Sequence, residues 1–359
     1  MKRILHLSGT MNMGGQETLI MNIYRNIDRS EVQFDFVVNT EERCFFEDEI
    51  EKLGGKVYRV PRLIHIFKHW KELSKILKEN KYDVIHRHTA SQVVFIDLLI
   101  AKLRNVKTRI IHSHNVSVDK KYQHLYKIFT PLINGLSTTK YACSEDAAKW
   151  LYGKRVKDFK VIYNGIDIDK FSYDEEVRKK VRSEFKIQDN IKVYGNVGRM
   201  SYQKNHMFLL DVFKNILEKD SNSVLLLCGD GEKREEIEEK AKELNIYEKV
   251  IFAGVRKDVN YMYQAMDYFV FPSLFEGLGI VLIEAQVAGL PCFIFDKRIP
   301  TISRISNNIH AFDEDADAKY WANVILANNE IKDRKIDKKD FEKFDIKYTT
   351  AQVLEDYLK

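Results

Sequence analysis

The sequence predicts an α/β protein built from two doubly wound domains. Short apolar runs alternate with longer amphipathic stretches along the chain, which indicates parallel strands joined by right-handed helical crossovers. The length of 359 residues suits two domains, each of which can bury its own core. This alternation is interrupted once, near residues 164–170, where a charged stretch follows. We therefore expect domains at residues 1–165 and 166–344.

In the first domain, apolar runs that are typical of buried strands are separated by helical patterns. Apolar residues within 19–27 and 64–77 recur at the three- and four-residue spacing of an amphipathic helix. The expected strands are residues 3–7, 33–38, 56–58, 83–86, 109–112, 140–143 and 160–162.

The second domain repeats this alternation, with helices expected at residues 207–217 and 232–244. Ligands bind at the carboxyl ends of strands in such sheets, so two facing domains would form a cleft. Residues 348–359 carry a further helical pattern that fits either domain. The expected strands are residues 192–197, 224–228, 250–252, 268–271 and 292–295.

Composition excludes several classes of protein. The hydrophobic fraction of 45% excludes a disordered chain, and the net charge of +5 comes without the dense basic stripe of a nucleic-acid binder. We find no apolar run long enough to cross a membrane and no signal peptide, so we expect a cytoplasmic protein. The four cysteines lie far apart without a CxxC pair, which indicates buried thiols rather than disulfides or metal ligands.

A first candidate site is the loop at residues 8–17, which follows a strand and opens a helix. Gly14 and Gly15 would let backbone N–H groups approach an anion at the helix N-terminus. The loop lacks the GxGxxG fingerprint of dinucleotide binding, and a simple tight turn is the alternative.

A second candidate is the loop at residues 198–205, just beyond a strand. Arg199 and Lys204 could clamp a diphosphate there, Arg199 through its planar fork and Lys204 as a point charge. The alternative is a pair of solvated loop cations.

The strongest candidate lies at residues 273–285, where Glu276 and Glu284 flank a Gly-x-Gly turn. A carboxylate on the apolar helix after this turn needs a partner, and ligand hydroxyl groups would be suitable ones. The free N–H groups of Leu278, Gly279 and Ile280 would add an anion site at the helix N-terminus. The alternative makes Glu276 a surface turn residue and places Glu284 in an internal salt bridge.

Histidines occur in two pairs just after strands, at residues 86–88 and 112–114. A spacing of two could suit a metal, but no Asp or Cys cluster completes such a site, so we expect none. We expect His86 and His88 to be structural, and a single histidine at a cleft edge to contact a phosphate or sugar hydroxyl. The sequence also lacks the GxSxG, Walker A and HExxH motifs of hydrolases and ATPases.

Taken in order, these motifs resemble those of retaining GT-B glycosyltransferases of family 4. The resemblance covers nearly the whole chain. Within the family, it is greatest to bacterial exopolysaccharide and capsule transferases of the EpsF type. It implies two facing Rossmann-like domains, with a C-terminal helix at residues 345–359 that packs back on the first. The motifs that carry it are the Gly-Gly-Gln-Glu loop, His112-Ser113-His114-Asn115, Tyr163–Asp167, the Gly-Arg…Lys-Asn loop, Cys228–Gly231 and the Glu276–Glu284 element.

The resemblance assigns roles in binding the donor diphosphate. Arg199 and Lys204 would hold it, and Gly15 and the amides of residues 278–280 would support it. Because the two cations would neutralise the leaving group, the reaction would need no metal and no other cofactor.

The remaining roles concern the sugar and the nucleoside. Glu276 would face hydroxyls of the donor sugar, Glu284 would accept hydrogen bonds from the ribose, and His114 would be the cleft histidine of the family. Backbone atoms of Arg256 would pair with uracil. No role is assigned around residues 300–305, where the family pattern is lost.

The implied activity is that of a retaining hexosyltransferase. A sugar would pass from a UDP-sugar to a saccharide or polyprenyl-linked acceptor in exopolysaccharide or capsule biosynthesis. The leaving phosphate oxygen would take the acceptor's proton on the same face, which retains configuration. A sugar-nucleotide epimerase and a non-catalytic sugar-nucleotide-binding partner subunit are the alternatives.

Peripheral membrane contact stays open beside these roles. Residues 64–81 and 120–133 are amphipathic and carry lysines, as interfacial helices do. The alternative is that both segments are ordinary core-packing helices.

Overall fold

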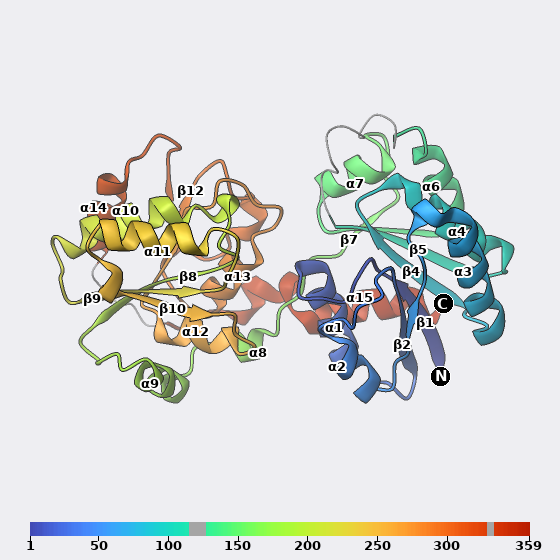
Figure 1. The fold of residues 1–359 in the computed structure, drawn as a ribbon, viewed down its shortest axis with the longest axis horizontal. Coiled ribbons are helices and arrows are strands. Elements are labelled where there is room, and N and C mark those ends of the chain that lie inside the picture. The colour runs from blue at the N-terminus through green and yellow to red at the C-terminus, as the bar shows by residue number, and fades with distance from the viewer. Residues whose placement is uncertain (115–126, 329–333) are drawn as a thin grey trace. The chain divides into compact units, whose positions relative to one another are not determined.

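The computed structural model describes residues 1–114, 127–328 and 334–359 (Figure 1). The chain divides into two compact units. Unit 1 comprises residues 1–166 and 343–359, and unit 2 comprises residues 167–342. Residues 120–126 of the second amphipathic segment, and Asn115 of the His-Ser-His-Asn motif, lie outside the described residues.

Unit 1 contains a seven-stranded, wholly parallel sheet in the order β3-β2-β1-β4-β5-β6-β7. Its central strands are buried because alternate residues enter two separate apolar cores on opposite faces, as Ile110 and Ile111 of β5 do. The strands are β1 (Lys2–Leu7), β2 (Val32–Val38), β3 (Val57–Arg59), β4 (Val84–Thr89), β5 (Thr108–Ser113), β6 (Thr139–Ala142) and β7 (Lys160–Val161).

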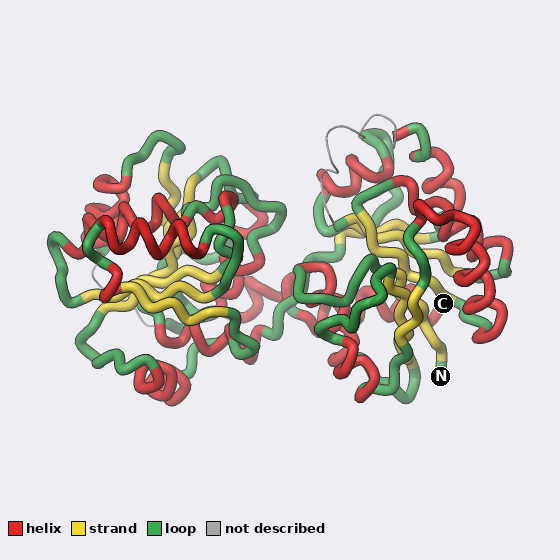
Figure 2. The backbone as a smooth tube through the Cα atoms, in the orientation of Figure 1, coloured by secondary structure: helices red, strands yellow, loops and turns green. Residues whose placement is uncertain are grey.

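Helices cover both faces of this sheet (Figure 2). The C-terminal helix α15 (Ile346–Leu358) packs beside α1 and enters the same core through Ile346, Val353 and Tyr357. The other helices are α1 (Gly15–Asn26), α2 (Glu47–Lys52), η1 (Leu63–His65), α3 (Ile66–Asn80), η2 (Gln92–Val94), α4 (Phe95–Leu103), α6 (Thr130–Leu136), α7 (Glu145–Tyr152) and η7 (Lys338–Phe344), which begins in unit 2.

Unit 2 contains a six-stranded parallel sheet in the order β10-β9-β8-β11-β12-β13. Here too, alternate residues of one strand enter different cores, as Leu226 and Leu227 of β9 do. The strands are β8 (Lys192–Val197), β9 (Ser223–Cys228), β10 (Val250–Gly254), β11 (Tyr268–Phe271), β12 (Cys292–Phe295) and β13 (Ile309–Phe312).

The helices of unit 2 include one that lies in the charged stretch. Asp174 accepts hydrogen bonds from the N–H groups of Glu176 and Val177 and so caps α9. The helices are α8 (Ile168–Phe171), α9 (Glu175–Glu184), η4 (Tyr202–Lys204), α10 (His206–Leu217), α11 (Arg234–Glu243), η5 (Tyr247–Lys249), α12 (Val259–Ala265), α13 (Ile280–Val287), η6 (Thr301–Ser303) and α14 (Ala318–Ala327).

These sheets and helices confirm the predicted doubly wound α/β class. Among the described residues, we find no helix that is both long and apolar enough to cross a membrane.

Candidate functional site

The candidate site in unit 2 lies at the carboxyl edge of its sheet. β8 and β11 are neighbours in space, and the strand order reverses between them. The loops that follow these two strands leave a parallel sheet in opposite directions, which is where such folds bind ligands. The loop after β8 carries Arg199 and Lys204, and the loop after β11 carries Glu276.

The two loops meet through one ion pair. Lys204 Nζ lies 2.7 Å from Glu276 Oε1, and the two side chains are only 14% and 7% exposed. The ammonium group also lies 4.9 Å from the centre of the Phe271 ring at the end of β11. Because an ammonium group has three donors, Lys204 can hold Glu276 and still bind an anion. The structure thus brings together two of the residues that the sequence predicts for the site.

Close backbone packing fixes the Lys204 loop on its other side. Gly229, in the Cys-Gly-Asp-Gly motif, has a φ of +139°, and a Cβ there would lie 2.1 Å from the carbonyl oxygen of Gly198. Only glycine allows this approach, so the loop after β9 lies directly against the loop after β8. Hydrogen bonds from Gly198 N–H to Cys228 O and from Met200 N–H to Asp230 O hold them together.

Arg199 lies apart from the ion pair in this structure. Its side chain is 73% exposed, and its Nε donates to Glu232 Oε2 at 3.0 Å. The predicted diphosphate clamp of Arg199 and Lys204 is therefore not assembled here. Arg199 would have to leave Glu232 to take part.

The N-terminus of α13 lies at the end of the Glu276 loop. Within the described ranges, no hydrogen bond uses the N–H groups of Leu278, Gly279 or Ile280. The Ser303 hydroxyl donates to the carbonyl oxygen of Leu278 and holds this turn in place. The three amides are therefore free to bind an anion.

Gln286 of α13 links the helix to residues 303–306. Its Nε2 donates to Ser303 O at 2.7 Å, and its Oε1 accepts from the N–H groups of Ile305 and Ser306. This segment, to which the sequence assigns no role, thus braces the helix that carries Glu284.

Glu284 occupies a largely apolar setting on α13. Burial raises the pKa of its carboxyl group to about 7, against the smaller opposing effects of a hydrogen bond from Tyr263 and the charge of Lys204. Tyr263 Oη donates to Glu284 Oε2 at 2.6 Å. The predicted alternative of an internal salt bridge is wrong, because the direct partner of this carboxyl group is the neutral phenol of α12.

Arg256 follows β10 in the next loop along the edge. Its guanidinium group contacts Asp258 at 2.8 Å and Glu184 at 2.8 Å, which raises its pKa further. These carboxylates occupy the side chain. They leave the backbone as the part of Arg256 that could pair with a base, as the resemblance implies.

In unit 1, the N-terminus of α1 already holds a carboxylate. The Glu17 side chain reaches back over the helix start, where a Cβ on Gly14 would lie 2.5 Å from Glu17 Oε2. Gln16 Nε2 contacts both Ser8 and Glu17. An anion near Gly15 would meet this carboxyl group, whose pKa burial raises.

His114 lies at the carboxyl end of β5 in unit 1. Its Nε2 lies 2.8 Å from His88 Nδ1, and its ring lies 4.0 Å from that of His112. Burial lowers the pKa of His114 to about 3, so the ring is neutral at physiological pH.

One prediction about the histidines needs correction. His86 and His88 lie within β4, which extends to Thr89, rather than in a loop after it. Residues two apart share a face of a strand, and both side chains are buried. Their predicted structural role agrees with this burial.

Among the contacts of this region that the sequence does not predict are those of Tyr263 and Ser303. Tyr263 is fully buried on α12, and a buried phenol needs a hydrogen-bond partner. A tyrosine on the apolar face of a helix thus indicates that a hydrogen-bond partner is present, but the sequence does not identify Glu284 as that partner.

Two family models match the chain. Residues 13–170 match "Glycosyltransferase Family 4", and residues 177–326 match "Glycosyl transferases group 1".

Two relatives extend the match over most of the chain. EpsF of Bacillus subtilis strain 168, described as a glycosyltransferase, is 36% identical over 82% of this chain and 79% of its own. UDP-Gal:alpha-D-GlcNAc-diphosphoundecaprenol alpha-1,3-galactosyltransferase of Escherichia coli is 30% identical over 73% of this chain and 71% of its own. Among solved structures, Anabaena HepE in complex with UDP-glucose superposes with a TM-score of 0.79 at 20% identity, covering 99% of both chains.

The pKa of Glu284 makes stability depend on pH. The folded protein binds this proton more tightly than the unfolded chain does, so the contribution of Glu284 is fully present below about pH 4.5. It falls by up to about 3 kcal/mol as the pH rises to about 7. Glu284→Gln, which is always neutral, should therefore gain Tm relative to the wild type at about pH 8 compared with about pH 5.

Thermal melts without nucleotide at both pH values measure this difference. Glu218→Gln on an exposed side chain is the matched control. An equal Tm difference between Glu284→Gln and the wild type at both pH values would contradict the assignment.

Proposed function

The chain belongs to the family 4, group 1 glycosyltransferases of the GT-B fold, and we propose that it transfers a hexose from a UDP-sugar with retention of configuration. The acceptor we propose is a saccharide or a polyprenyl-linked saccharide in exopolysaccharide or capsule biosynthesis. The observation that carries the proposal is the Lys204–Glu276 pair at the strand-order reversal of unit 2, beside the free amides of α13.

Lys204 and the amides of residues 278–280 would bind the diphosphate. Negative charge develops on the leaving phosphate oxygens as the bond to the sugar breaks, so fixed positive groups there stabilise the transition state most. The half-buried setting of Lys204 strengthens this effect, because little water competes for the ammonium group. Arg199 would join by exchanging Glu232 for phosphate. A metal would then be unnecessary.

The proposed reaction proceeds on one face of the sugar. The bond from the anomeric carbon to the phosphate oxygen breaks, and its electron pair stays on that oxygen. The acceptor oxygen bonds to the anomeric carbon from the same face and gives its proton to the leaving phosphate. The Escherichia coli relative, which uses UDP-Gal and is named for an alpha-1,3 product on a diphosphoundecaprenol acceptor, supports this choice of chemistry.

The sugar and the nucleoside would be held by separate carboxylates. Glu276 would accept a hydrogen bond from a hydroxyl of the donor sugar, and Lys204 would keep it aligned. Glu284, oriented by Tyr263, would accept from the ribose hydroxyls. The Arg256 backbone would contact the base, and His114 would contact the sugar.

A thermal-shift panel with UDP, GDP, ADP and several UDP-sugars tests the donor class. A ligand at 100 times its Kd stabilises the folded state by about 2.7 kcal/mol, so a selective UDP response should be clear. The stabilising UDP-sugars then enter a turnover assay with and without saccharide acceptors. A non-catalytic partner would bind without turnover, and an epimerase would convert the donor without an acceptor. A lack of response to every nucleotide would contradict the proposed site.

Lys204→Ala should lower turnover by about 10²–10³-fold, since it removes the main cation at the leaving phosphate. The assay is release of UDP from the best UDP-sugar. Lys214→Ala, whose lysine pairs with exposed Glu218 on the surface, should keep normal turnover. Unchanged turnover in Lys204→Ala would rule out this role.

We also propose that unit 1 contacts an anionic membrane through the start of α3. Ile64 and Phe67 are 83% and 88% exposed, although both are large apolar residues. Lys68, Lys71 and Lys75 are exposed on the same helix, while Leu73 and Leu77 pack into the core.

This arrangement combines the two alternatives for residues 64–81, an interfacial helix and a core-packing helix. One face of α3 packs on the sheet, and its N-terminal end presents apolar and basic side chains together. Interfacial helices combine the same two features. Membrane contact would place the transferase beside a polyprenyl-linked acceptor.

Replacing Lys68, Lys71 and Lys75 by Ala should weaken binding to vesicles with anionic lipid by at least about tenfold, because each lysine near such a surface contributes about 1 kcal/mol. Vesicle co-sedimentation at low salt measures this. Lys→Ala changes at three lysines on the surface of unit 2, exposed Lys179 and half-exposed Lys214 and Lys233, are the charge-matched control. Equal vesicle binding by the two triple variants would refute the contact.

A further inference from the structure

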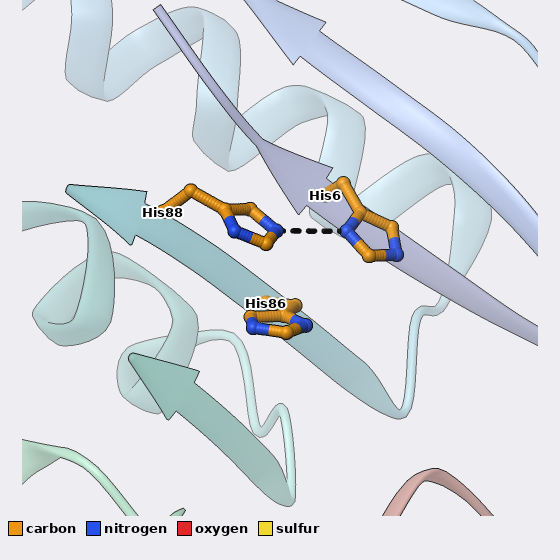
Figure 3. A group of neighbouring side chains, drawn as sticks. All are labelled: His6, His86 and His88. Atoms are coloured by element: carbon orange, nitrogen blue, oxygen red, sulfur yellow. Dashed lines mark hydrogen bonds between the residues drawn. The ribbon is translucent and has the colours of Figure 1, made fainter. Parts of the chain in front are cut away.

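Unit 1 contains a buried group of histidines that the proposed reaction does not explain. His6 of β1 and His86 and His88 of β4 lie together on one face of the sheet, as Figure 3 shows. His112 of β5 and His114, which follows β5, continue the group. His6, His86, His88 and His112 are each no more than 3% exposed. Five imidazole rings in one core are costly unless their nitrogens are hydrogen-bonded.

Four contacts connect most of these nitrogens in a single row. His114 Nε2 lies 2.8 Å from His88 Nδ1, and His88 Nε2 lies 3.0 Å from His6 Nδ1. His6 Nε2 lies 3.5 Å from Tyr357 Oη, which lies 2.5 Å from His86 Nδ1. We call His114, His88, His6, Tyr357 and His86 the histidine relay.

Every ring of the histidine relay is neutral. Burial lowers the pKa of His6 and of His114 to about 3, and it lowers the pKa values of His86 and His88 well below the usual range. A neutral imidazole has one N–H donor and one bare nitrogen that accepts. In a row of such rings, the orientation of one proton therefore fixes all the others.

Tyr357 sets the direction of the row. Its single hydroxyl proton can point to His86 or to His6. The separation of 2.5 Å from His86 Nδ1 is short for any hydrogen bond, but it lies at the lower limit for an O–H donor and below the range of an N–H donor. The phenol therefore donates to His86 Nδ1, and its oxygen accepts from His6 Nε2. His6 Nδ1 must then accept from His88, and His88 Nδ1 must accept from His114.

We propose that the histidine relay holds His114 in the tautomer with its proton on Nε2, which leaves Nδ1 unprotonated as a hydrogen-bond acceptor. No hydrogen bond in the described part of the chain uses His114 Nδ1. Given the proposed transferase function, this nitrogen accepts from a sugar hydroxyl. His88, His6 and Tyr357 are positioning residues, because they act on the sugar only through His114.

The same rings form a poor metal site. One nitrogen from each of His6, His86 and His88 lies within 4.8 Å of the other two, and the same holds for His88, His112 and His114. The rings of His86 and His88 are stacked, however, with centres 4.1 Å apart and planes 25° apart. A metal is bound in the plane of each imidazole ring, so two stacked rings do not point to a common ion. His88 also has both nitrogens in contact with other histidines.

The test is a two-bond ¹H–¹⁵N correlation spectrum of the full chain labelled with ¹⁵N-histidine, with His114 assigned by its loss in His114→Gln. The wild type should show His114 with at least about a tenfold excess of the Nε2–H tautomer, as expected for one hydrogen bond of ordinary strength. Tyr357→Phe removes the hydroxyl and should bring the two tautomers within about threefold of each other.

Tyr141→Phe is the matched control. Tyr141 is also buried, lies edge-on to His86, and donates to Asp356 of the same helix α15, but it does not belong to the relay. It should leave the His114 spectrum unchanged. His6→Phe, which cuts the row between Tyr357 and His88, replaces Tyr357→Phe if that variant does not fold.

Three results would overturn the proposal: an even tautomer mixture in the wild type, an unchanged His114 signal after the relay is cut, or equal shifts in Tyr141→Phe. Stoichiometric Zn²⁺ binding that shifts His6, His86 and His88 together would also overturn it, in favour of a metal site. Because the spectrum needs no substrate, its outcome is independent of whether the transferase activity is found.

Discussion

The structure depends on one topological constraint, that every strand in both sheets runs parallel to its neighbours. A parallel strand can reach its neighbour only through a crossover, so helices cover both faces and all carboxyl ends lie at one edge. Where the strand order reverses, two neighbouring loops lead to helices on opposite faces of the sheet. Their polar groups therefore line an open crevice at the edge. In unit 2 this reversal brings Lys204 and Glu276 together, although 72 residues separate them. In unit 1 the reversal lies between β1 and β4, which carry His6 and His88.

Strand bounds were predicted correctly where a strand is buried on both faces and every residue in it is apolar. β11 and β12 consist of four consecutive apolar residues each, and their predicted bounds match those observed. β4 was predicted to end at residue 86 because its last residues are polar. Arg87 and His88 are buried, however, because Arg87 hydrogen-bonds to Leu7 O and His88 to His6 and His114. β13 was not predicted, since it is an edge strand in which only the last residue, Phe312, is buried. The run of charges at residues 174–180 concealed α9, whose propensity and cap are good but whose apolar face is narrow.

In the candidate site, the positions of the residues could be predicted from the sequence, but their contact partners could not. Motif spacing placed Lys204, Glu276 and Glu284 on the correct loops and helix, because these positions follow directly from where strands end. Partners were harder to predict, since they depend on contacts between elements distant in sequence. Nothing in the local sequence pairs Arg199 with Glu232 or Tyr263 with Glu284. The relay is the extreme case, because its direction depends on a hydroxyl 243 residues from His114.

Helix α15 has a consequence for the order in which the protein is made. Unit 2 is one uninterrupted segment, whereas unit 1 is completed only by residues 343–359. During synthesis, the sheet of unit 1 emerges long before the helix that covers one of its faces. Until α15 docks, Tyr141 and His86 lack their partners Asp356 and Tyr357. The apolar surface that Ile346 and Val353 of α15 cover stays exposed to solvent. Unit 1 therefore cannot complete this face until residues 346–358 have been made and have docked.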